Sequence, residues 1–390
     1  MNTLTHNRKH AFVLVFLFAL TLCPIPSTLT PVFASGSGAT AMQILKTDLS
    51  PRAMGMGGSF VAVADDIYAI NYNPAGLAQL YVPEVSAMMF SGFGDSQLQS
   101  LAIGMPMPFL GLARLAKPAM TVSAVFSDAG RLTWRTINGD GTVSSSDLDA
   151  QVDKVITISY GEKVYSNEVN IEGYNAKIEQ YLGMSVKYIN SKMLQKYSAS
   201  AFAFDGGWLL MEPKLGLTLG AGLANYGVGI RYLRETEKLP TIVRLGVALQ
   251  RPTLMDESAL ISVEADFHTN EAKKSLRFGL EYHFEKVFNV RVGYKTLEDN
   301  KGLTVGLGVR YNDMTLDFAV GLGNEVFNAS QLALSYKFNG YVNTAYKRKV
   351  NYKESEPERK TVSPAPKAKP LPKKSPPGEN PKNSDFFWID

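Results

Sequence analysis

The chain has 390 residues, of which 45% are hydrophobic and 19% charged, with 40 basic and 36 acidic side chains. This apolar content excludes an intrinsically disordered protein and is sufficient for a large core or a wide lipid-facing surface. The single cysteine excludes a disulfide scaffold, and with only four histidines in the chain we expect no metal site and no cofactor.

The charge is concentrated at the two ends of the chain. Residues 1–34 carry two basic and no acidic side chains, and residues 341–390 carry 11 basic and 6 acidic ones. The body between them therefore holds 27 basic and 30 acidic residues, a net charge of −3. This balance gives no support for nucleic-acid binding by the body.

The first 34 residues have the pattern of an export signal. Two basic residues precede an apolar run from Ala11 to Cys23, a length typical of a signal peptide and too short for a membrane-spanning helix. Val32-Phe33-Ala34 is a suitable cleavage site, so we expect residues 1–34 to be removed. A lipoprotein would instead be acylated at Cys23, but the bulky Leu22 before it disfavours that processing.

Alternation of apolar and polar residues dominates the body of the chain. In residues 276–284, Leu, Phe, Leu, Tyr and Phe alternate with Arg, Gly, Glu and His, as a period-two strand requires. We count about fourteen such segments, each of about 9–11 residues, the length of a tilted membrane strand. They begin near Pro83, Gln97, Ala119, Val152, Glu179, Ser198, Pro213, Thr241, Ala259, Ser275, Lys286, Gly302, Asp313 and Ser330.

A soluble β-sandwich and a membrane β-barrel would both show this alternation. The segment length favours the barrel, and so do aromatic residues at segment ends, such as Tyr282 and Tyr336, where interface girdles would lie. Several positions on the polar faces are glycine or alanine, and others carry charged residues of both signs. This mixture suits a confined interior better than an open surface. We therefore predict an all-β fold, a transmembrane antiparallel β-barrel of about 14 strands in the outer membrane of a Gram-negative cell.

Two long polar loops are expected between the strands. Gly139–Gly141 and Ser144–Ser146 mark the first, and Glu162–Lys177 marks the second. Long loops normally face the outside of the cell and short turns the periplasm. Phe109 and Leu110, in the loop after the second segment, could face a hydrophobic ligand or touch lipid, and lipid contact is the better interpretation.

A glycine-rich stretch precedes the first strand and differs from all of them. It reads PRAMGMGGSFVAVADD over residues 51–66 and NYNPAGLA over residues 71–78. Its glycines allow tight turns and close backbone contacts, and Asp65 and Asp66 can cap a turn or a short helix. Asn73-Pro74 and Gly76 set another turn. The candidate structural or gating residues are Arg52, Gly55, Gly57, Gly58, Asp65, Asp66, Asn73, Pro74 and Gly76.

Two chemical interpretations of this stretch have less support. A phosphate-binding loop would follow a strand and continue into a Lys-Ser/Thr pair, and the sequence has neither feature here. A catalytic or metal-binding pair of Asp65 and Asp66 is disfavoured because adjacent carboxylates point apart in an extended chain and no histidine is near. We expect structural hydrogen bonding, no catalytic residue and no enzyme activity.

Residues 42–338 resemble the PorV/PorQ family of outer-membrane proteins and, more distantly, the FadL long-chain fatty acid transporters. Residues 51–78 carry most of the resemblance, with LPTIVRLG at 239–246 and FGLEY at 278–282. The resemblance implies a fourteen-stranded barrel in which residues 51–78 belong to a plug inside the lumen. It implies either FadL-like binding or passage of a hydrophobic molecule or, as in PorV, an accessory cargo-binding role in type IX secretion.

Charged residues on the polar faces of the strands would point into the lumen. Their mixed signs indicate internal ion pairs that stiffen a filled barrel, whereas a selective pore more often shows one dominant sign. His283 is expected to form hydrogen bonds in the lumen. The lumen charges are Arg244, Glu264, Asp266, Arg277, Glu281, Arg291, Arg310 and Asp317.

The last fifty residues form a separate Pro- and Lys-rich tail, which holds eight of the 20 prolines and is expected to be extended in the periplasm. Its end, including Phe386, Phe387 and Trp388, is an apolar cluster. It suits a docking peptide for a secretion-system, periplasmic or cell-wall partner, or a solvated extension whose end sticks weakly to the barrel or membrane. A structural barrel tethered to periplasmic partners is a further hypothesis. The predicted parts are a signal peptide (1–34), a plug (35–81), a barrel (82–338) and the tail (339–390).

Overall fold

The computed structural model describes residues 40–339, apart from 93–95, 172–173, 253–256, 272, 286, 298–300 and 324–328. The predicted signal peptide (1–34) lies outside the described residues. The same is true of the predicted tail beyond residue 339, with Phe386, Phe387 and Trp388. These two predictions therefore stay predictions.

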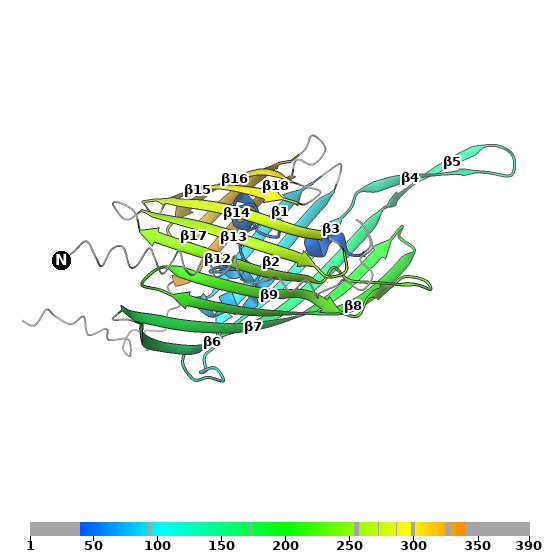
Figure 1. The fold of residues 1–390 in the computed structure, drawn as a ribbon. Coiled ribbons are helices and arrows are strands. Elements are labelled where there is room, and N and C mark those ends of the chain that lie inside the picture. Colours follow the sequence, from blue (N-terminus) through cyan, green and yellow to red (C-terminus); the bar gives the residue numbers. More distant parts are fainter. Residues whose placement is uncertain are drawn as a thin grey trace, which may run out of the picture. The chain divides into compact units, whose positions relative to one another are not determined.

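Fourteen antiparallel strands close into a barrel (Figure 1), which confirms the predicted fold class. Each strand pairs with its neighbours in chain order, and β18 pairs with β1 to complete the ring. The strands are β1 (Glu84–Ser91), β2 (Gln97–Pro106), β3 (Ala119–Asp128), β6 (Gln151–Ile171), β7 (Tyr174–Met193), β8 (Tyr197–Glu212), β9 (Leu217–Gly227), β12 (Ile242–Pro252), β13 (Ser258–His268), β14 (Lys273–Phe284), β15 (Phe288–Thr296), β16 (Gly302–Tyr311), β17 (Met314–Leu322) and β18 (Ala329–Lys337).

The first predicted polar loop is a two-stranded hairpin, β4 (Arg131–Ile137) and β5 (Val143–Asp149), which projects beyond the barrel wall. Its tip contains Gly139–Gly141, whereas Ser144–Ser146 belong to β5. A smaller pair, β10 (Ile230–Arg231) and β11 (Thr236–Glu237), lies in the connection between β9 and β12. We call the end of the barrel that carries β4 and β5 the hairpin end, and the opposite end, where β1 begins and β18 ends, the terminal end.

The prediction of a second long loop at Glu162–Lys177 is wrong. These residues continue β6 and β7 past the terminal end of β3, with a β-bulge between Lys163 and Tyr165. Lys163 and Lys177 both form ion pairs with Glu179, at 3.0 and 2.8 Å. The many charged residues suggested a loop, but ion pairs within β7 and between β6 and β7 stabilise the paired extension.

Apolar side chains cover the outside of the barrel, and polar side chains face its lumen. On β14, Phe278 and Leu280 point outward and are exposed, whereas Arg277, Gly279 and Glu281 point inward and are buried. Every other barrel strand also carries exposed apolar side chains. A soluble sandwich would expose its polar face, so this arrangement is that of a membrane-spanning barrel.

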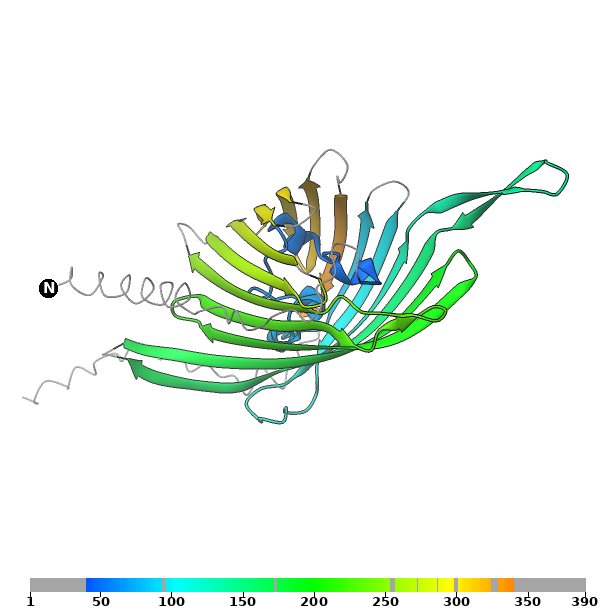
Figure 2. The ribbon, with the colours of Figure 1, turned by 45° about the vertical axis from the view of Figure 1, so that its right-hand side comes forward.

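The first described residues, 40–80, lie inside the ring of strands, where Figure 2 shows them in blue. We call them the inner segment. They form the short helices η1 (Gln43–Lys46), α2 (Pro51–Gly55), η2 (Ile67–Asn71) and η3 (Pro74–Gln79). In the described part of the chain, no helix is long and apolar enough to cross a membrane.

The inner segment contacts the wall around most of the ring. Helix α2 packs against β15 to β18, η2 against β1 to β3, and η3 against β3 and β6 to β8. Each of three helices has a side-chain cap, because Ser50, Asp66 and Asn73 accept hydrogen bonds from backbone N–H groups in the first turn of α2, η2 and η3. Of these, only the cap at Asp66 was predicted from the sequence. The segment thus fills the middle of the lumen.

Wall glycines allow the two backbones to approach closely. A Cβ atom at Gly183 would lie 2.2 Å from the carbonyl carbon of Pro74, and one at Gly293 would lie 2.0 Å from the amide nitrogen of Gly57. These strands therefore need glycine at the positions that contact the inner segment. Other wall glycines at which a Cβ would crowd the inner segment are Gly161, Gly207, Gly220, Gly246, Gly279 and Gly306.

Two adjacent glycines on β8 test this packing. A Cβ at Gly207 would lie 2.0 Å from Oδ1 of Asn73, whereas a Cβ at Gly206 would have no atom within 4 Å. We expect Gly207→Ala to lower the free energy of unfolding by about 1–3 kcal/mol because it overpacks the lumen. Gly206→Ala should leave it unchanged. Denaturant unfolding of the purified barrel measures both, and equal effects of the two variants would contradict the close packing.

Candidate functional site

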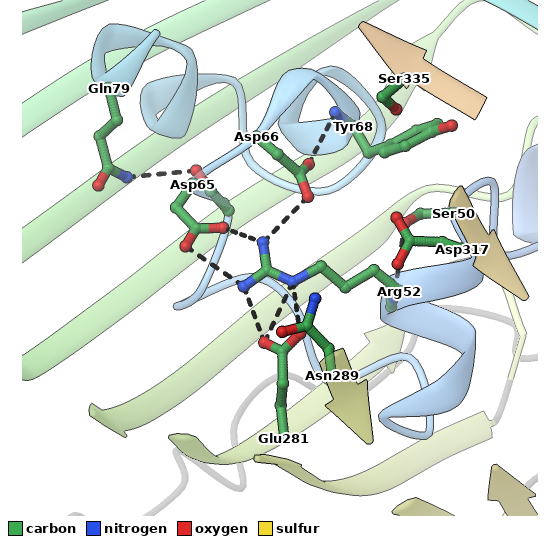
Figure 3. A network of polar contacts seen from close by, with 12 residues as sticks. Ser50, Arg52, Asp65, Asp66, Tyr68, Gln79, Glu281, Asn289, Asp317 and Ser335 are labelled. Atoms are coloured by element: carbon green, nitrogen blue, oxygen red, sulfur yellow. Dashed lines mark hydrogen bonds and ion pairs between the residues drawn. The ribbon is translucent and has the colours of Figure 1, made fainter. Parts of the chain in front are cut away.

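Arg52 is the centre of a buried charged network (Figure 3). It lies at the start of α2, and its guanidinium group contacts Glu281 of β14 through Nε at 3.0 Å and Nη2 at 2.8 Å. Its Nη1 donates to Asp66 at 3.0 Å and also to Asp65. The same group lies 5.4 Å from the ring centre of Phe60. Arg52 therefore joins α2, Phe60 and the Asp65–Asp66 pair to Glu281 of the wall.

The network continues along the wall from Glu281, whose side chain is fully buried. Glu281 accepts a hydrogen bond from Arg291 Nε at 2.7 Å, and Arg291 Nη1 donates to Asp317 at 2.6 Å. His283 Nε2 lies 3.4 Å from Glu281, and its other ring nitrogen contacts Asn289. Each buried charge therefore has an opposite charge beside it, which offsets the cost of removing it from water.

A second charged cluster lies nearer the hairpin end. Asp48 of the inner segment pairs with Lys295 and, at 3.2 Å, with Arg277. Arg277 also lies 3.2 Å from Asp266, which Arg244 approaches at 3.8 Å. Burial alone would raise the pKa of the Asp48 carboxyl, but the two cations hold that pKa below its ordinary value of 3.8.

Polar wall side chains also satisfy the backbone of the inner segment. Glu264 accepts hydrogen bonds from the N–H groups of Phe60 at 2.6 Å and Val61 at 2.7 Å. Asn73 donates to the carbonyls of Val61 at 2.8 Å and of Trp208, on β8, at 3.0 Å. The irregular turns of the segment thus depend on partners that the wall supplies.

The motif glycines lie at tight turns or close contacts. Gly57 and Gly58 have positive φ angles of 66° and 78°, which residues with a side chain rarely adopt. Gly55 lies against Gly306 of β16, and Gly76 lies so close to Ala64 that a Cβ would be 1.9 Å from its carbonyl oxygen. Pro74 occupies the first turn of η3, where its missing N–H costs nothing.

Arg310 differs from the other lumen charges. It is exposed near the terminal end of β16 and lines a cavity there. Within the described residues we find no ion-pair partner for its side chain. The other seven, Arg244, Glu264, Asp266, Arg277, Glu281, Arg291 and Asp317, are buried and lie within ion-pair distance of an opposite charge.

A polar cluster that the sequence did not predict lies beside a register shift between two barrel strands. The register between β8 and β9 shifts between Phe204 and Gly206, and Asn225 adopts a φ of 60° there. Lys187 of β7 contacts both Asp205 and Asn225 at 2.7 Å. A lysine on the polar face of a strand was a visible signal, but the register shift that brings its partners together was not.

The terminal end of the lumen holds a cavity of about 290 Å³. Its lining is almost entirely polar or charged and includes Arg52, Glu84, His283, Arg310 and Lys337. Such a lining suits water or ions better than an apolar ligand. In the described residues, no cluster of three or more His, Cys, Asp or Glu side chains could hold a metal ion.

The hairpin end holds two adjoining cavities of about 470 and 460 Å³, which share Gln43, Thr47 and Phe90. The first is mainly basic, with Lys46, Lys273, Lys274, Arg277 and Lys295 in its lining. The second has a substantial apolar wall formed by Met42, Ile44, Phe90, Leu98 and Met193. This end can therefore hold a molecule of mixed character, one part apolar and one part anionic.

No protein-family model matches the chain, and no curated protein matches it. Among solved structures, the toluene transporter TbuX of Ralstonia pickettii is 12% identical, with a TM-score of 0.46, over 74% of this chain and 98% of that one. The toluene transporter TodX of Pseudomonas putida is 13% identical, with a TM-score of 0.44, over 78% and 98%. Omp33 of Acinetobacter baumannii is 6% identical, with a TM-score of 0.39, over 66% and 98%.

Replacing Arg52 tests the first network. We expect Arg52→Gln to destabilise the barrel by about 3–5 kcal/mol because Glu281 and the two aspartates lose their shared cation. The matched control is Arg310→Gln, which removes an arginine from the same cavity where no ion-pair partner was found among the described residues. Denaturant unfolding measures both, and similar midpoints for the two variants would show that the network contributes little.

The Asp48 cluster predicts a defined pH dependence. Because the folded pKa lies below 3.8, the ion pairs of Asp48 should contribute fully above that pH and be lost as the pH falls below it. Asp48→Asn should therefore be less stable than the parent protein at neutral pH, and the difference should shrink only in strong acid. Unfolding curves from pH 7 to about pH 2 measure this, and a difference that disappears near pH 6 would contradict it.

Proposed function

We propose that this protein is an outer-membrane barrel that binds or passes a hydrophobic molecule in a FadL-like manner. The observation that carries the proposal is the partly apolar cavity at the hairpin end, where Met42 and Ile44 of the inner segment face Phe90, Leu98 and Met193 of the wall. The more distant resemblance of residues 51–78 to the FadL transporters supports the same function.

The proposed orientation follows from the lengths of the connections. The two longest connections, residues 129–150 and 228–241, lie at the hairpin end. At the terminal end the β16–β17 turn has only two residues, and the longest connection is residues 107–118. Short turns usually face the periplasm and longer connections the outside. The hairpin end, with its apolar and basic cavities, would then receive molecules from outside the cell.

In this proposal the inner segment is also the gate. Its backbone touches the wall glycines, so a molecule can pass along the lumen only if part of the segment moves. Met42 and Ile44 lie in the same short stretch as Asp48 and Arg52. A ligand that binds better when η1 is displaced would shift the population toward an open state through this stretch.

Ligand binding can be tested at Met42, which is buried and lines the apolar cavity. We expect Met42→Gln to weaken binding of a dansyl-labelled fatty acid to the purified barrel by about tenfold, because it replaces an apolar side chain of the cavity with a polar one. The control is Ile137→Gln in the exposed β4–β5 hairpin at the same end. Fluorescence titration measures affinity, and absent saturable binding or equal affinities would overturn the proposal.

We propose a PorV-like accessory role in secretion, or a structural barrel tethered to periplasmic partners, as the second candidate. The packed middle of the lumen favours a binding protein over an open pore. The predicted tail would make the periplasmic contact through Phe386, Phe387 and Trp388. A full-length protein that retains one specific co-purifying partner, lost on deletion of residues 382–390, would support this role over ligand passage.

A further inference from the structure

The connection between β2 and β3, residues 107–118, exposes four large apolar side chains. It projects outward from the wall at the lower edge of Figures 1 and 2. Leu112 is 90% exposed, and Phe109, Leu110 and Leu115 are each at least half exposed. Four large apolar side chains on one loop would be costly in water, at about 25 cal/mol for each Å² of apolar surface.

The loop has a defined conformation that presents these side chains. The N–H of Gly111 donates to the carbonyl of Ala116 at 3.1 Å, and the N–H of Ala113 donates to Oε1 of Glu162 at 2.7 Å. Glu162, in β6, is itself held by the hydroxyl of Tyr160 at 2.8 Å. The buried Glu162 carboxylate therefore fixes the loop to the wall, with its apolar side chains pointing away.

The loop also continues the lipid-facing surface. On β2, the outward residues Leu101, Ile103 and Met105 are exposed and lead directly into the loop. A basic residue, Arg114, is exposed beside Leu112 and has a left-handed φ of 56°. Apolar side chains next to an arginine, at the edge of an apolar belt, match the boundary between acyl chains and phosphate groups.

We propose that residues 107–118 are an interfacial anchor that binds phospholipid at the terminal end of the barrel. Leu110, Leu112 and Leu115 enter the acyl region, and Arg114 binds the phosphate of an anionic headgroup. Lipid fits better than a protein partner because the loop is continuous with a surface that already faces lipid. This inference does not depend on which molecule the lumen binds.

A nitroxide label at Leu112→Cys tests the depth of the loop. Cys23→Ser removes the chain's single cysteine, so the full chain carries one label. In vesicles of phosphatidylethanolamine and phosphatidylglycerol, we expect the label to be more accessible to oxygen than to a water-soluble nickel complex. A label at Val143→Cys, exposed in the β4–β5 hairpin, should show the reverse.

Two outcomes would overturn the anchor. A label at position 112 that behaves like the one at 143 would place the loop in water. A label that is shielded in detergent as well, or that shows spin–spin broadening, would mean that it packs against protein or a second copy of the chain.

The headgroup contact has its own test. With phosphatidylcholine in place of phosphatidylglycerol, or with Arg114→Glu, the label at 112 should become more accessible to the nickel complex; Arg114→Lys should keep the parent depth. Each membrane-surface cation contributes about 1 kcal/mol with anionic lipid, about a fivefold change in binding. Equal depth in both lipids and in all variants would overturn the phosphate contact.

Discussion

The pairing of buried charges between the inner segment and the wall is the constraint on which the rest of the structure depends. Arg52, Glu281, Arg291 and Asp317 form one chain of opposite charges from the inner segment along the wall. A buried charge without a partner costs several kcal/mol, so each member fixes the position of the next. The segment and the wall are consequently one folding unit: the wall supplies partners for the turns of the segment, and the segment supplies partners for the wall.

The close contact between the inner segment and the wall also explains why glycines recur on the inner face of the strands. A strand facing a water-filled pore tolerates any polar side chain, but Gly183 and Gly293 face a backbone at contact distance. Glycine is a poor strand former, so its recurrence on the inner face of so many strands needs a packing reason. That reason is the inner segment, whose own Gly57 and Pro74 make the matching close approaches.

Local patterns were enough to predict the barrel, and long-range pairings were not predictable. Alternation in segments such as 276–284 marks a strand whose two faces differ, and fourteen such segments define the ring. Position on the polar face was also enough to select Arg277 and Glu281 as inward charges. Their partners were hidden, because Asp48 and Arg52 lie 229 residues away in a stretch with no periodicity. The extension of β6 and β7 was missed because paired charges resemble a solvated loop.

The ion pairs also limit how the lumen could open. Burying about 150 Å² of apolar ligand surface contributes about 4 kcal/mol, which is close to the cost of leaving one buried ion unpaired, about 3–5 kcal/mol. One hydrophobic ligand would therefore offset the loss of about one ion pair near η1 and Asp48, and it would not suffice to break the contacts of Arg52 with three carboxylates as well. Opening by ligand binding would be confined to the hairpin end, and release at the terminal end would need a second event acting on Arg52. A ligand in the apolar cavity would thus be held before it is passed on.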